Sequence, residues 1–211
     1  SRQVRRGQPD AAAGCAVCLP DLRGYGETSA GSSHGPRSIG TTLSCRAQVL
    51  GQTLLGSRLR DLRSVLLFLQ TRSGLDTKVS LWGDSLAALN PPERSEVVPY
   101  GVDNPTTQAE QSAGLLVLLT ALFEDHVNAI YARGTFAGFR SLLDSQFLYV
   151  PHHSVVTGAL TVGDVADIAT ALFPRPVLVE CPVDGLNRGL GSDTIAMTFA
   201  PTGQAYRVAN A

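Results

Sequence analysis

Short apolar runs and longer helical patterns alternate along this chain. Four runs have the length and composition of buried strands, and they span 14–19, 78–82, 127–132 and 177–180. Helices are expected between and after them, at 53–71, 112–123, 164–172 and 192–209. Strands that alternate with helices of this length indicate βαβ units and a parallel sheet.

The helix expected at 53–71 has the clearest pattern. Its leucines recur at four-three spacing, which places them on one face, and Arg58 is among the charged residues expected on the exposed face. The stretch 134–162 shows no such period, and it is expected to form a cap or an insertion over a site. The whole chain, 1–211, is interpreted as one α/β domain.

Composition and charge narrow the class of protein. The 211 residues are 44% hydrophobic, which is enough for a sizeable core, and the net charge of -1 gives no broad surface for nucleic acid. No apolar run reaches the length of about 18 residues that a membrane span needs. The basic N-terminus is not followed by the apolar segment of a signal peptide, so the cytoplasm is the favoured compartment.

Cys15 and Cys18 form a single C-x-x-C pair without a second pair or a histidine motif to complete a zinc site. They fall in the predicted strand 14–19, where a spacing of three puts their side chains on opposite faces. Buried, inert thiols are therefore favoured over redox or metal chemistry, and neither a metal nor a cofactor is predicted.

The strongest candidate for chemistry is Ser85. The segment 81–87 reads as a strand, a tight turn with Ser85 at its apex, and a helix of small residues, which is the context of a nucleophile elbow. Gly83 and Ala87 would be small because strand and helix cross closely there. The backbone N–H of Leu86, at the start of that helix, would donate to an oxyanion. A nucleophile is favoured over a purely structural turn.

Asp184 follows the predicted strand 177–180, where a carboxylate can orient a catalytic histidine. The alternative is an Asp-Gly turn in which the carboxylate caps its own backbone. A glycine-rich loop at 21–27 would lie beside the site, with a pairing of Asp21 and Arg23 as scaffolding.

Three segments resemble the α/β-hydrolase superfamily, specifically its branch of dienelactone hydrolases and acetyl xylan esterases. They are 21–28, 76–85 and 174–184, and they follow one another in that family's order. The resemblance implies a three-layer α/β/α sandwich with a mostly parallel sheet and ester hydrolysis through an acyl-enzyme. By position in the motifs, Ser85 matches the serine nucleophile and Asp184 matches the acid.

The catalytic histidine of that family follows the acid, whereas this chain has no histidine after Asp184. The sequence is accordingly expected to be a piece of a longer hydrolase that lacks the early strands and the last strand. Alternatively, His152 or His153 serves as the base, although loop histidines that bond backbone or solvent are favoured. His126 is expected at a helix terminus, and His34 in a flexible loop.

These features predict a serine carboxylic ester hydrolase whose partner is a small-molecule ester with a small acyl or aryl group. The alternative is a truncated, non-catalytic protein of the hydrolase fold, and a peptidase or a carbon–carbon hydrolase uses the same elbow. No nucleic acid or membrane is expected as a partner. A missing strand would expose a sheet edge, and pairing with another chain in a homo-oligomer would hide it.

Overall fold

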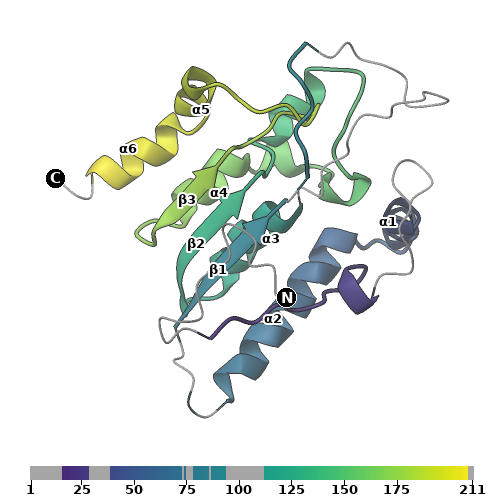
Figure 1. Cartoon of the computed structure of the whole chain (residues 1–211), viewed down its shortest axis with the longest axis vertical. Coiled ribbons are helices and arrows are strands. Elements are labelled where there is room, and N and C mark those ends of the chain that lie inside the picture. Colours follow the sequence, from purple (N-terminus) through teal and green to yellow (C-terminus); the bar gives the residue numbers. More distant parts are fainter. Residues whose placement is uncertain are drawn as a thin grey trace, which may run out of the picture.

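The protein has a mixed α/β fold in the computed structural model, which describes residues 16–28, 39–72, 74, 78–85, 87–93 and 112–208. Three strands, β1 (Val79–Asp84), β2 (Val127–Arg133) and β3 (Val177–Glu180), form a parallel sheet in the order β1-β2-β3 (Figure 1). Three of the four predicted strands and the predicted class are thus confirmed.

Helices connect these strands as the alternating pattern predicted. The helices are α1 (Ile39–Val49), α2 (Leu54–Gln70), α3 (Ser112–Phe123), α4 (Val165–Ala171), α5 (Ser192–Thr198) and α6 (Ala200–Val208). Helix α3 links β1 to β2 and α4 lies between β2 and β3, and both α2 and α4 pack against α3. Helix α4 begins at a capping box of Asp164, as expected, whereas the predicted final helix is divided at Phe199 into α5 and α6.

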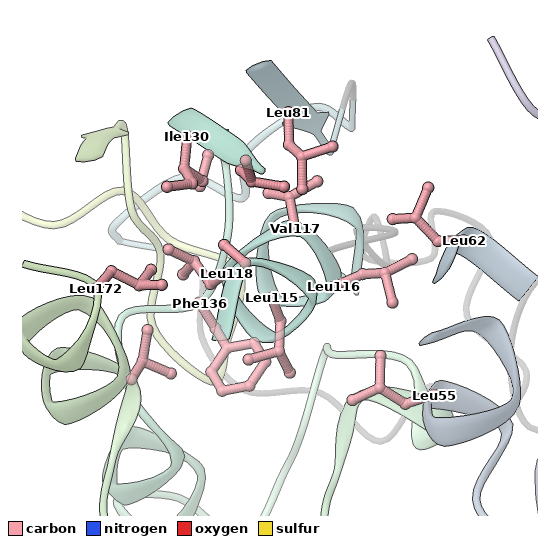
Figure 2. Close-up of a cluster of buried hydrophobic side chains, with 14 of the residues drawn as sticks. Leu55, Leu62, Leu81, Leu115, Leu116, Val117, Leu118, Ile130, Phe136 and Leu172 are labelled. Carbon is pink, nitrogen blue, oxygen red and sulfur yellow. The ribbon is translucent and has the colours of Figure 1, made fainter. Parts of the chain in front are cut away.

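The core forms around α3, because this helix packs against the sheet on one side and against α2 and α4 on others (Figure 2). Leu115 and Leu118 of α3 are fully buried, and Leu62 and Leu66 of α2 are buried beside them on the face that the leucine spacing predicted. Burying a leucine side chain contributes about 1.5–3 kcal/mol, so this cluster dominates the stability of the described part.

The predicted strand at 14–19 is wrong over its described residues. Residues 16–19 form no strand, Leu19 is 79% exposed, and Cys18 is exposed rather than buried. An apolar run becomes a strand only where a neighbouring strand takes its backbone hydrogen bonds, and among the described residues β1 pairs with β2 alone.

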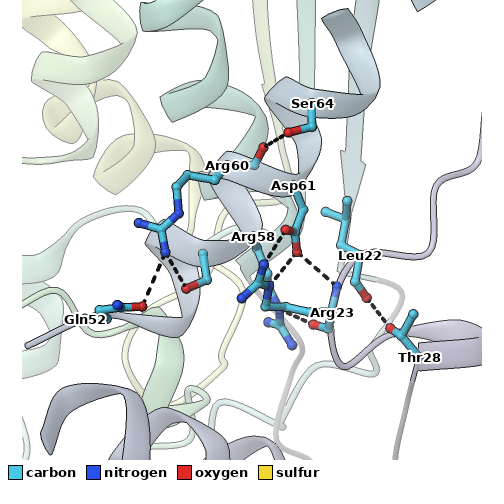
Figure 3. Close-up of polar contacts among 9 residues, drawn as sticks. Leu22, Arg23, Thr28, Gln52, Arg58, Arg60, Asp61 and Ser64 are labelled. Atoms are coloured by element: carbon cyan, nitrogen blue, oxygen red, sulfur yellow. Dashed lines mark hydrogen bonds and ion pairs between the residues drawn. The ribbon is translucent and has the colours of Figure 1, made fainter. Parts of the chain in front are cut away.

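Two arginines, Arg23 and Arg58, attach the loop after residue 19 to α2 (Figure 3). The guanidinium of Arg23 donates two hydrogen bonds to Asp61 on α2, at 2.6 and 2.7 Å, so the expected pairing of Arg23 with Asp21 is wrong. This contact lowers the pKa of the Asp61 carboxyl. Arg58 was expected on the exposed face of α2, yet it is buried and donates to the carbonyl of Arg23. A neighbouring chain segment thus converts part of that face into an interior surface.

The described residues form two layers, the sheet and the helices α2, α3 and α4 on one of its faces. On the opposite face Trp82 and Leu178 are exposed. The third layer of the expected sandwich does not occur among the described residues. Between β2 and α4, the stretch 134–162 contains only short 3₁₀ turns, consistent with its irregular sequence.

Candidate functional site

The carboxyl end of β1 meets the first turn of α3 very closely. A Cβ atom on Gly83 would lie 2.3 Å from the carbonyl oxygen of Ala113 and 2.9 Å from the backbone nitrogen of Gly114. The sequence correctly predicted a small residue at Gly83 for a strand–helix crossing. The helix that crosses there is α3, which begins at Ser112, and not a helix directly after the strand.

The helix predicted to follow Ser85 is wrong, because the described residues 87–93 adopt no helix. Hydrogen bonds to another loop explain the difference. The backbone N–H of Asn90 donates to the carbonyl of Asn187, and the Asn90 side chain donates to the carbonyl of Leu186. These contacts hold the segment extended against the loop that follows β3, so the chain leaves the sheet at Ser85 without an elbow helix.

Ser85 itself extends the sheet by one residue. Its backbone N–H donates to the carbonyl of Arg133 at 3.0 Å, and its side chain alternates in the same register as the buried Leu81 and Gly83. The hydroxyl is buried and has no hydrogen-bond partner among the described residues. Leu86, the predicted oxyanion donor, lies outside those residues. An unpartnered buried hydroxyl costs about 1–3 kcal/mol, so Ser85 is a candidate for contact with a ligand.

His153 is the one predicted base that reaches the same helix end. It is buried, and its Nε2 atom lies 3.3 Å from the hydroxyl of Ser112, the first residue of α3. Ser85 is two residues beyond Gly83, which touches that first turn. The fold thus brings Ser85 and His153 to one helix terminus, although no hydrogen bond joins them.

Nothing in the sequence indicated the polar cluster around Ser112. The Ser112 hydroxyl lies 2.6 Å from the hydroxyl of Tyr25, which accepts a hydrogen bond of 2.8 Å from Arg58. The Arg58 guanidinium also stacks over the Tyr25 ring, 3.8 Å from its centroid. Only Tyr25 belongs to a loop that was expected beside the site. Ser112 and Arg58 each fall in a helical pattern, where nothing marks them as different from their neighbours.

The other histidines have different surroundings. The Nδ1 atom of His152 lies 2.9 Å from the hydroxyl of Ser44 and its Nε2 atom 3.9 Å from the sulfur of Cys45, both on α1. His126 follows the C-terminal end of α3, 3.6 Å from a glutamate, as expected of a helix-terminus residue. His34 lies outside the described residues. His153 is therefore the better of the two candidate bases.

Asp184 caps its own turn, which is the alternative that the sequence left open to a catalytic role. Its carboxylate accepts hydrogen bonds from the backbone N–H groups of Leu186 and Arg188, each at 2.9 Å. The Arg188 guanidinium adds two contacts of 2.8 Å. In the part of the chain that the structure describes, no histidine bonds to this carboxylate. Asp184 therefore closes its own turn, and the three members of the predicted triad are not assembled.

No group of three or more His, Cys, Asp or Glu side chains within the described ranges is arranged to hold a metal ion. In those ranges, no single helix is long and apolar enough to cross a membrane. One bent pair of helical segments, His152–Thr161 with Val165–Ala171, is long and apolar enough by length and composition alone.

Comparison of the chain with known protein families, curated proteins and solved structures finds no match. The resemblance to the α/β-hydrolases therefore stays a prediction.

A charged cluster lies at the carboxyl end of the sheet on its exposed face. The Tyr131 hydroxyl donates to Glu180, while Arg133 lies 3.5 Å from Asp84 and 3.7 Å from Glu180. The hydrogen bond to Glu180, with burial as the second cause, raises the pKa of Tyr131 to about 12.

We expect Glu180→Gln to lower the pKa of Tyr131 from about 12 toward its ordinary value of 10.0. Because the native pKa is raised, this contact stabilises the fold below pH 10, and the effect is lost as pH rises through about 12. The measurement is the phenolate absorbance during an alkaline titration, with Tyr131→Phe subtracted to isolate this residue. A midpoint unchanged by Glu180→Gln would contradict the assignment.

Proposed function

We propose that the protein hydrolyses small carboxylic esters through an acyl-enzyme formed on Ser85. The observation that carries the proposal is the buried, unpartnered hydroxyl of Ser85 at the end of β1, close to the first turn of α3. The positive end of a helix dipole favours the negative charge that develops on an ester oxygen during attack. The strand–helix crossing at Gly83 also suits the α/β-hydrolase fold, which we propose for the whole domain.

In the proposed reaction, the Ser85 hydroxyl attacks the ester carbonyl carbon and His153 accepts its proton. The alcohol leaves with that proton, and water then releases the acid from Ser85. To accept the proton of Ser85, His153 exchanges its contact with the Ser112 hydroxyl for one with the Ser85 hydroxyl. Asp184 is bonded to its own loop, and we assign it to positioning that loop rather than to orienting the base.

A second candidate function is a non-catalytic binding protein with the hydrolase fold. It is favoured by the contacts of the polar residues, since His153 bonds to Ser112 and Asp184 bonds to Arg188. The two candidates differ in whether the Ser85 hydroxyl is an activated nucleophile.

Labelling with a fluorophosphonate probe, followed by peptide mapping, separates them. We expect the label on Ser85, and we expect Ser80→Ala, which removes an exposed hydroxyl from the same strand, to be labelled as the wild type is. A folded sample that takes no label would support the binding protein. A label on Ser112 would support a serine hydrolase whose nucleophile is Ser112 instead of Ser85. Comparing an ester with its amide analogue then tests esterase against peptidase activity.

A further inference from the structure

Two backbone donors close to Ser85 are already used by the sheet. The N–H of Ser85 donates to Arg133, and the N–H of Gly134 donates to the carbonyl of Glu180, each at 3.0 Å. An oxyanion formed on Ser85 therefore cannot use these two amides without breaking hydrogen bonds of the sheet. A side-chain donor close to the end of β1 would add to the effect of the helix terminus on this charge.

The conformation of Gly134 brings a side-chain hydroxyl into this region. Gly134 has a φ of +64°, in the left-handed region, and a Cβ atom there would lie 2.8 Å from the Cβ of Ser85. This turn directly after β2 interrupts the alternation of side chains, so Thr135 faces α3. The Thr135 Cβ would lie 2.5 Å from a Cβ on Gly114, which means that Thr135 occupies space that only a glycine of α3 leaves free.

Thr135 is buried and its backbone is hydrogen-bonded, but its hydroxyl has no partner among the described residues. The residue is fully buried, its carbonyl accepts a hydrogen bond of 2.9 Å from the N–H of Val183, and its hydroxyl bonds to no group in the described part of the chain. Ser85 and Thr135 are thus two buried, unpartnered hydroxyls that flank Gly134, beside the first turn of α3. Buried polar groups are nearly always hydrogen-bonded. Four buried side-chain atoms lack a partner among the described residues, and two of them, the hydroxyls of Ser85 and Thr135, lie together here.

We infer that Thr135 is a further catalytic residue, whose hydroxyl donates a hydrogen bond to the oxyanion formed when Ser85 attacks an ester. The inference rests on the proposed function and deepens it. As the carbonyl carbon bonds to the Ser85 oxygen, the carbonyl π electrons move to the ester oxygen, which becomes negative. A fixed donor in a buried site stabilises this charge more than it stabilises the neutral ester. The serine and threonine thus have separate roles, as nucleophile and as donor.

The experiment measures hydrolysis of p-nitrophenyl acetate by the full chain and by three variants. Thr135→Val replaces the hydroxyl by a methyl group of similar size, and we expect kcat to fall by about 10²–10³-fold with little change in KM. Thr135→Ala, which is smaller, should show the same loss if the valine does not fit. Thr135→Ser keeps a hydroxyl, and we expect it to retain activity within about tenfold.

Thermal unfolding distinguishes catalysis from structure. The hydroxyl that is removed has no partner among the described residues, so Thr135→Val is expected to unfold at the same temperature or higher. Loss of kcat in a stable Val or Ala variant, with activity kept in Thr135→Ser, supports the inference. Full activity of a folded Val or Ala variant, beside an active wild type, overturns the role of Thr135 and leaves Ser85 untouched. A wild type that neither turns over the ester nor takes the fluorophosphonate label overturns the proposed function, and the role of Thr135 with it.

Discussion

Gly83→Ala is expected to destabilise the protein by about 3 kcal/mol or more, the upper end of what an overpacked core costs. The added methyl group would lie 2.3 Å from the carbonyl oxygen of Ala113 and 2.6 Å from its carbon, distances at which atoms repel strongly. Both are backbone atoms, so no side chain can rotate away. Helix α3 would have to move off β1, and because α3 is the centre of the core, its leucines would lose contacts on every side. Denaturant unfolding followed by circular dichroism measures this loss.

The matched control is Gly203→Ala in α6. The same methyl group meets nothing closer than 3.8 Å there, and alanine has a higher helix propensity than glycine. We expect this variant to be as stable as the wild type or up to about 1 kcal/mol more stable. Equal stabilities for the two variants would mean that β1 and α3 are not in close contact, and the location of the candidate site would then be wrong.

The spacing of hydrophobic residues predicted the helices correctly where a helix depends mainly on its own sequence. The four-three leucine spacing located α2, and the apolar stretch at 112–123 located α3 to the residue, because each helix satisfies its own backbone and needs only one apolar face or a wholly apolar surface. Three apolar runs form strands because each has a parallel strand beside it that takes its backbone hydrogen bonds. The run at 14–19 has the same composition but forms no strand over 16–19, since pairing depends on partners that composition does not specify.

The candidate site was predicted less well, because it depends on contacts between distant segments. Ser85 and His153 were candidates from the sequence, and their roles stay predictions, but the sequence also predicted an elbow helix that the contact between Asn90 and Asn187 prevents. It also placed Arg58 on an exposed face, since helical spacing cannot show that the loop of Tyr25 covers that position. Thr135 carries no motif. Its role in our proposal follows from the left-handed conformation of Gly134, the missing side chain of Gly114 and a buried hydroxyl without a partner among the described residues.

The position of α3 reconciles the missing elbow with a serine nucleophile. In the predicted elbow, the helix that supports the oxyanion begins at the residue after the serine. Here the chain continues away from Ser85, and the helix that crosses Gly83 begins at Ser112. Strand end and helix start are still adjacent in space, so the electrostatic effect of the helix terminus on Ser85 does not require that they be adjacent in sequence.

Ser85→Ala is expected to lower kcat for p-nitrophenyl acetate by at least about 10⁴-fold, because removal of the nucleophile abolishes the acyl-enzyme route and leaves only the effects of binding and charge stabilisation. The fold should persist, since the hydroxyl has no partner to lose among the described residues. Ser80→Ala is the control on the same strand. Its hydroxyl is exposed and donates to Asn128 at 2.9 Å, so activity should be unchanged. If Ser85→Ala kept its activity while Ser112→Ala lost it, the hydroxyl beside His153 would be the nucleophile, and Ser85 would have no part in the reaction.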